Sequence, residues 1–433
     1  MTVKKLVYYF IALYVISIPI NRGMVLPIIG EKLQLPELVF LALAFSSIPL
    51  FLKIKLKNIN LIGIDWGLAF YFLAVVASYL FHPTHTALLD VAGLIYLLVL
   101  YTIINFYFVF YEPDKSQIKF LITKFSAISL LVLNIIGLVG FAFVLLGFKT
   151  ELAIYYPNYP FFGNVYRIRA FTQEPVMMAS ILSVFILTVM AGFNLTGFTL
   201  KERKWLKIIL VLSFISLALT ITKSAVITFA AAFAIYSIQQ NKLSALKPFL
   251  WGMSLVALLV FTHFVVVRSV NFDAKKSYHG LADKPVLSIG NYYVVQTDYY
   301  YLKKAAIISG ERFWLTGIGS GNFSDYLPTL KQEGLYPTKF RDYDPISTYF
   351  GAYAELGVFG LLALLFLYFQ VFKTLNRLKN QNLDDLWLAS LISIFGFMAC
   401  ESFVTDTMNF RHYWWVLACV AVYVRIQEAP KKL

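Results

Sequence analysis

Long, nearly uninterrupted runs of apolar residues dominate the chain. A helix needs about 20 apolar residues to cross the hydrocarbon core of a bilayer, and most of the runs approach or exceed that length. The pattern predicts an all-α integral membrane protein with about twelve transmembrane helices. The predicted spans are residues 6–20, 36–52, 61–81, 87–110, 122–147, 175–196, 205–221, 224–239, 249–268, 346–372, 386–404 and 412–427.

Two connections between these spans are much longer than the others, residues 148–174 and 269–345. The chain therefore divides into residues 1–268 with nine spans, a large loop over 269–345, and residues 346–433 with three spans and a tail. Within the loop, residues 299–309 predict an amphipathic helix at the membrane surface that ends at Gly310, with Lys303 and Lys304 on its polar side. The sequence GIGSG at 317–321 predicts a flexible turn.

The basic residues predict the orientation of the spans. Cytoplasmic loops of membrane proteins are enriched in lysine and arginine. With the N-terminus in the cytoplasm, 20 of the 37 basic residues fall on the cytoplasmic side. Both termini are therefore predicted to be cytoplasmic, and both long segments periplasmic. The short outer loops hold only Arg22, Lys32, Lys223 and Arg411.

Composition fits this assignment. Hydrophobic residues make up 59% of the chain and charged residues only 14%, whereas a soluble domain has about 25% charged residues. A formal net charge of +14 would favour a nucleic-acid partner for a soluble protein. Here the basic residues lie between apolar runs, so anionic lipid headgroups are the predicted counter-charges and no nucleic acid is expected. No nucleotide, hydrolase or metal-site motif is present, which predicts neither metal nor cofactor.

Fixed positive charge at the predicted outer face is the main candidate for chemistry. Arg167 and Arg169 precede the sixth span, and Lys223 lies in a tight turn between the seventh and eighth. Guanidinium groups match phosphate oxygens, and a cation so near an apolar helix needs a partner or a wet cavity. We expect only one of the two arginines to point into a given cavity. Arg169 is preferred because it lies closer to the helix start, and pairing with Glu174 is an equal alternative. Arg411 is expected to reach lipid headgroups or to anchor a helix end, and the long loop adds Arg312 and Arg341.

The candidate carboxylates have competing explanations. Glu174 opens the sixth span, where the helix dipole favours it whatever the function. Asp344 followed by Pro345 equally fits an N-cap with proline in the first helical turn. Asp298 lies in the long loop. Glu355 falls inside the tenth span, where capping cannot explain it, and an intramembrane carboxylate is a functional candidate by default.

Three stretches resemble the Wzy/O-antigen ligase superfamily of bacterial polysaccharide polymerases and ligases. RAFTQEP at 169–175 is similar to the segment of that family with an arginine, an aromatic residue and Glu-Pro or Asn-Pro opening a helix. Thr222-Lys223-Ser224 is similar to its short Ser-Arg turn. RFWLTGIGSGNFSDYLP and DPISTYFGAYAELGVFG are similar to its Gly-x-Gly stretch and its helix ending in Glu-Leu-Gly. The likeness covers roughly residues 160–360.

Two departures from the family pattern refine the comparison. Lys223 stands where the family usually carries arginine, which keeps the charge and loses the bidentate fork. Ile346 and Ser347 stand where ligase members commonly have His-Asn. The second departure favours a polymerase over a ligase.

The resemblance implies a GT-C-like glycosyltransferase of the bacterial inner membrane. It would transfer a polyprenyl-pyrophosphate-linked oligosaccharide onto another lipid-linked repeat unit at the periplasmic face, with a chain-length regulator protein as a partner. Fixed cations can stabilise a departing pyrophosphate without metal. Arg169 and Lys223, with Arg312 or Arg341, would bind the pyrophosphate. The base would be Glu174, Asp344 or Asp298, unranked. The alternatives are an O-antigen ligase with a distinct acceptor, and a polysaccharide transporter or flippase without catalysis.

Overall fold

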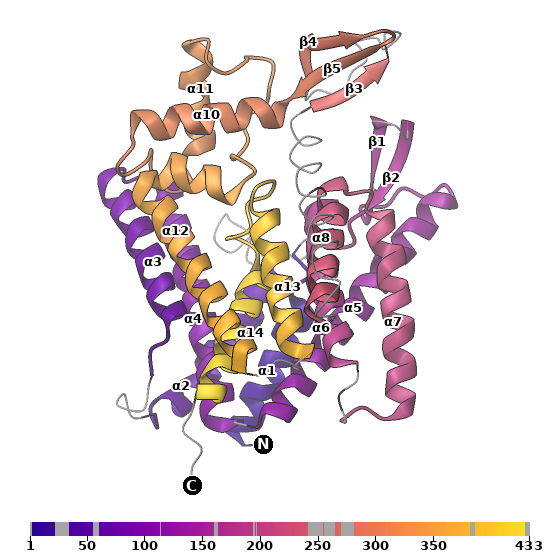
Figure 1. Cartoon of the computed structure of the whole chain (residues 1–433), viewed down its shortest axis with the longest axis vertical. Coiled ribbons are helices and arrows are strands. Elements are labelled where there is room, and N and C mark those ends of the chain that lie inside the picture. Colours follow the sequence, from indigo (N-terminus) through magenta and orange to yellow (C-terminus); the bar gives the residue numbers. More distant parts are fainter. Residues whose placement is uncertain are drawn as a thin grey trace.

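The computed structural model describes residues 2–21, 34–54, 60–112, 114–159, 163–193, 195, 197–240, 254, 265–269, 281–381 and 386–428. The described helices form a bundle, and a smaller layer of helices and strands lies over one end of it (Figure 1). We call this end of the bundle the loop end. The first residues of α1 and the last residues of α14 both lie at the opposite end (Figure 1).

Eleven of the twelve predicted spans are helices. Among the described residues, α3, α4, α5, α6 and α12 are long and apolar enough to cross a membrane by length and composition. The protein is therefore a helical membrane protein, whereas twelve crossings and the orientation stay predictions. The eleven helices are α1 (Val3–Ser17), α2 (Leu35–Phe51), α3 (Gly63–Phe81), α4 (His85–Tyr111), α5 (Lys115–Leu145), α6 (Pro175–Gly192), α7 (Leu200–Leu219), α8 (Lys223–Gln240), α12 (Thr348–Gln381), α13 (Leu386–Glu401) and α14 (Arg411–Glu428).

The prediction of a ninth span over 249–268 is wrong at its end. Its last residues belong to β3 (Val265–Ser269), and most of the remaining run lies outside the described residues. β3 pairs antiparallel with β5 (Tyr292–Thr297), which also pairs with β4 (Leu281–Ile289). Three consecutive valines begin β3, and β-branched residues favour extended chain. The sheet order is β3-β5-β4.

The segment over 148–174 also contains strands. β1 (Ala153–Tyr159) and β2 (Gly163–Ile168) form a two-stranded antiparallel sheet whose register pairs Ala153 with Ile168. Short strands therefore occur in both long segments of a fold that is mainly helical, as an all-α membrane protein requires. These strands bring the end of β2 to the start of α6, where the candidate arginines lie.

The loop helix predicted over 299–309 is present as α10 (Asp298–Arg312) and is followed by α11 (Phe323–Gln332). α10 continues through Gly310, which the sequence predicted to end it. A Cβ atom at Gly310 would collide with the ring of Tyr353 in α12, so this glycine serves close packing of the two helices. Lys303 is only 3% exposed and does not face water as predicted, whereas Lys304 is exposed.

The glycine-rich stretch at 317–321 is bonded to α12 and is not a free turn. The amide of Ile318 donates to the carbonyl oxygen of Ala354 at 2.9 Å, and that of Gly319 to Glu355 at 3.1 Å. α12 is interrupted at Gly357, which has φ 68° and ψ −162°. The carboxylate of Glu355 accepts hydrogen bonds from the backbone amides of Phe323, at 3.3 Å, and Gly321.

We expect Gly317→Ala to destabilise the protein more than Gly334→Ala. Both glycines have φ near +70°, so both variants carry the same backbone strain. At Gly317 an added Cβ would also overlap the backbone of Glu355, whereas at Gly334 it would meet nothing within 4 Å. Overpacking of this kind costs about 1–3 kcal/mol. The apparent melting temperature in detergent measures the difference, and equal values would show that the close packing is not required.

Candidate functional site

Three non-glycine residues of the described chain have positive φ: Ala170 at 50°, Ile221 at 48° and Ile346 at 47°. For β-branched isoleucine this conformation is a clear outlier, and each such residue costs on the order of 1–3 kcal/mol. The three residues precede α6, α8 and α12, beside Arg169, Lys223 and Asp344. Strained backbone concentrates at functional sites, so these three helix starts form the candidate site.

Arg167 connects the first two helix starts. Its Nε donates to the carbonyl oxygen of Thr220 at 2.8 Å, and its Nη2 donates to Oγ1 of Thr222 at 2.9 Å. The guanidinium also lies over the ring of Tyr156, 4.8 Å from its centroid. The two bonded threonines stand on either side of the strained Ile221. Arg167 thus holds the turn that leads into α8, whose first residue is Lys223.

Arg169 is held by backbone carbonyls. Its Nε donates to Glu151 at 2.6 Å and its Nη1 to Gln173 at 3.2 Å. Glu174 is exposed at the N-cap of α6 and forms no ion pair with Arg169, so that predicted alternative is wrong. Thr172 fixes the turn by donating to the carbonyl oxygen of Arg169 at 2.6 Å. Arg167, Arg169 and Lys223 together are called the cationic group.

Both arginines are buried, but they bond to different partners, Arg167 to Thr220 and Thr222 and Arg169 to Glu151 and Gln173. Residues two positions apart on an extended chain lie on the same face, and Arg167 and Arg169 are only 7% and 9% exposed. Because side chains two positions apart on a strand share a face, the sequence could have kept Arg167 beside Arg169 as a candidate.

A second group of charges lies around the start of α12. It consists of Asp90 in α4, Asp344, and Asp406 in the connection between α13 and α14, and we call it the acidic group. The three carboxylates interact electrostatically. Asp90 accepts a hydrogen bond from Ser320, and Asp406 accepts one from Asn409 at 2.7 Å. Asp406 is one of the candidate carboxylates of the sequence, whereas Asp90 lies inside a predicted span and was missed, and only the fold brings these distant positions together with Asp344.

Two carboxyls of the acidic group, those of Asp344 and Asp406, lie outside the predicted spans and have raised pKa values. Desolvation, followed by the negative charges of Asp90 and Asp344, raises the pKa of Asp406 to about 6. Asp344 is accessible to solvent. Desolvation by the surrounding protein nevertheless raises its pKa, and the negative charge of Asp325 adds to this rise. α12 begins at Thr348, so Asp344 does not cap it as predicted. An accessible carboxyl with a raised pKa is suited to accept a proton.

The loop end of α13 contacts both α6 and the start of α12. Ser180 of α6 donates to Oε2 of Glu401 at 2.8 Å. The next residue, Ser402, accepts at its carbonyl oxygen from the amide of Thr348 at 2.9 Å and from Oγ of Ser347 at 3.0 Å. α13 thus contacts α6 on one side and α12 on the other (Figure 1). The cationic group lies on the α6 and α8 side, and the acidic group on the α12 and α4 side.

The other predicted residues lie in the layer above the bundle. Asp298 begins α10, and burial raises its pKa to about 6. Arg312 ends α10 and pairs with Glu333 at 2.6 Å, while Arg341 is exposed and donates to the hydroxyl of Tyr343 at 3.4 Å. These contacts do not involve the cationic group. Arg411 pairs with Glu37 of α2 and so anchors a helix end, one of its two predicted roles.

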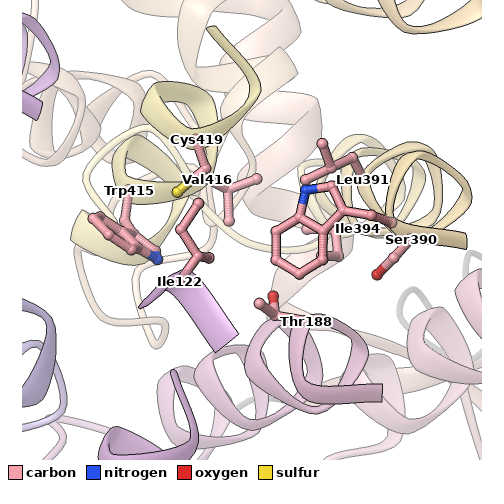
Figure 2. Close-up of a pocket in the computed structure, with 9 residues that line it drawn as sticks. Ile122, Thr188, Ser390, Leu391, Ile394, Trp415, Val416 and Cys419 are labelled. Carbon is pink, nitrogen blue, oxygen red and sulfur yellow. The ribbon is translucent and has the colours of Figure 1, made fainter. Parts of the chain in front are cut away.

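A small cavity lies deeper in the bundle (Figure 2). Its volume is about 10 Å³, and apolar side chains line most of it, so it is too small for more than a water molecule. Thr188, which lines it, is thirteen residues beyond the start of α6, or roughly 20 Å along the helix. Among the described residues no group of three His, Cys, Asp or Glu side chains is arranged to hold a metal ion. No protein-family model matches the chain, and no curated protein matches it.

Proposed function

We propose that this protein is a polysaccharide polymerase of the bacterial inner membrane, a GT-C-like member of the Wzy/O-antigen ligase superfamily. It would transfer a polyprenyl-pyrophosphate-linked glycan onto another lipid-linked repeat unit at the periplasmic face. The observation that carries the proposal is the pairing of a cationic and an acidic group on two sides of the loop end of α13, each beside strained backbone.

The cationic group suits a pyrophosphate leaving group. As the bond between the anomeric carbon and the pyrophosphate oxygen breaks, the electron pair moves to the pyrophosphate and negative charge grows there. Preorganised cations at that position stabilise the transition state and need no reorganisation. Lys223 lies in the first turn of α8, where the helix dipole also favours an anion. We assign the pyrophosphate to Arg169 and Lys223, with Arg167 holding the turn that carries Lys223.

The acidic group suits the acceptor hydroxyl. The acceptor oxygen bonds to the anomeric carbon of the donor, and its proton must pass to a base. Asp344 is the preferred base because it is accessible and its pKa is raised. Glu174 lies on the opposite side, next to the cationic group, and Asp298 interacts with Lys303 in α10. The lipid bilayer supplies both polyprenyl-linked substrates, and a chain-length regulator protein belongs to the proposal as a partner.

Purified protein in liposomes tests the proposal against its alternatives. With polyprenyl-pyrophosphate-linked repeat units as the sole substrate, a polymerase yields a ladder of longer glycans and releases polyprenyl pyrophosphate. A ligase yields no ladder and forms product only when a distinct acceptor, such as a lipid A core, is added. A transporter moves the lipid-linked sugar across the bilayer and forms no bond. Absence of a ladder from folded protein would contradict the proposed function.

A further inference from the structure

Lys303 of α10 is a buried lysine whose ammonium is directed at the backbone preceding α12. Its Nζ donates to the carbonyl oxygen of Ile346 at 2.7 Å and to that of Pro345 at 3.2 Å, and the ring of Tyr299 lies 5.6 Å away. A charged or polar group is costly to bury unless it is hydrogen-bonded. The two carbonyls therefore fix Lys303 and are in turn fixed by it.

One of the two bonded residues, Ile346, has a strained backbone. Ile346 has φ 47°, a conformation in which a β-branched side chain persists only when the surroundings enforce it. Pro345 has its own φ fixed by its ring. Together these two residues set the direction in which the chain leaves Asp344 and enters α12.

We propose that Lys303 is a positioning residue that holds the backbone of Pro345 and Ile346 in its strained form and thereby aims the carboxylate of Asp344. This inference rests on the proposed function, in which Asp344 is the base. It names a residue that makes no contact with the reacting atoms and acts only through the segment over 344–347.

Hydrogen bonding, and not charge, is the basis of this role. Burial lowers the pKa of Lys303 to about 7, and the nearby Asp298 opposes that shift. A neutral amine keeps two N–H donors, which is enough for the two carbonyls. The carboxyl of Asp298 and the ring of Tyr299 face Lys303 from α10 itself, and the two carbonyls face it from the segment before α12.

Lys303→Met tests the inference because it keeps an unbranched side chain only one atom shorter and removes the donors. A misplacement on the ångström scale costs on the order of 10- to 100-fold in rate. We expect kcat for polyprenyl pyrophosphate release to fall by that factor with KM within about twofold, since substrate binding is untouched. Lys304→Met, on the exposed side of the same helix, is the matched control and should keep the wild-type rate.

A second readout does not depend on activity. In the full-length protein in nanodiscs, Lys303→Met should increase amide hydrogen exchange over residues 344–348, while exchange in α11 stays as in the wild type. Unchanged exchange over 344–348 would overturn the inference. If the wild type forms no polymer, the proposed function fails, and the exchange experiment still reports on Lys303.

A rescue experiment separates positioning from general destabilisation. Glycine adopts positive φ at no steric cost, so Ile346→Gly should restore low exchange over 344–348, and most of kcat, to the Lys303→Met protein. Ile346→Val keeps the β-branched strain and should restore neither. If Lys303→Met alone does not fold, recovery of folding by Ile346→Gly but not by Ile346→Val supports the inference. Equal behaviour of the two double variants would overturn it.

Discussion

Replacing Arg169 or Lys223 with alanine is expected to reduce polymer synthesis by about 10²- to 10³-fold, the usual effect of removing one preorganised group that stabilises transition-state charge. Both cations lie at helix starts beside strained backbone. The loss should appear in kcat, because the charge on the leaving pyrophosphate develops only as the glycosidic bond breaks. The rate of polyprenyl pyrophosphate release in proteoliposomes measures it.

Conservative variants separate this effect from a folding defect. Arg169 also bonds to the carbonyls of Glu151 and Gln173, so Arg169→Ala needs a melting temperature in detergent beside its rate. Lys223→Arg keeps the cation and adds a bidentate fork, and we expect it to retain most of the activity. Lys304→Ala, an exposed cation of α10, should have no effect. Full polymer length with both Arg169→Ala and Lys223→Ala would rule out the pyrophosphate assignment.

The membrane helices were largely predictable because a single physical requirement produces them. Backbone groups in lipid must be satisfied within the segment, so a long apolar run becomes a helix. The prediction failed at the end of one run, where Val265 to Val267 belong to β3, because β-branched residues favour extended chain. Local rules also failed at Gly310, which is a glycine because Tyr353 packs against it and not because the helix ends.

The candidate site was predictable only in part. The sequence drew attention to Arg169, Lys223 and Asp344, since each lies at the border of an apolar run. It could not indicate that Asp90 and Asp406 join Asp344, because those positions are far apart along the chain and only the packing of α4, α12 and α14 unites them. Amphipathic periodicity also placed Lys303 toward water, whereas the contact that buries it is supplied by the segment before α12.

Asp344→Asn is expected to reduce the rate by about 10²- to 10⁴-fold, the usual contribution of a general base. The amide keeps the size of the side chain and cannot accept the proton of the acceptor hydroxyl. Asp342→Asn is the matched control, because Asp342 lies in the same segment and pairs with Lys331 at 2.7 Å outside the acidic group. Nearly equal rates for Asp344→Asn and the wild type would remove Asp344 from the mechanism.

If Asp344 is the base, the direction in which the wild-type rate changes with pH can be predicted. A base works only when deprotonated, and surrounding protein and Asp325 raise the pKa of Asp344. The rate should therefore fall as the pH drops through a value above the ordinary aspartate range. Asp325→Asn removes this negative charge, so the pKa of Asp344 should decrease and the acidic limb of kcat/KM should move to lower pH. Asp325 is an exposed residue of α11, so the maximal rate should stay near that of the wild type. A limb that stays in place, or moves to higher pH, would assign the titration to another group.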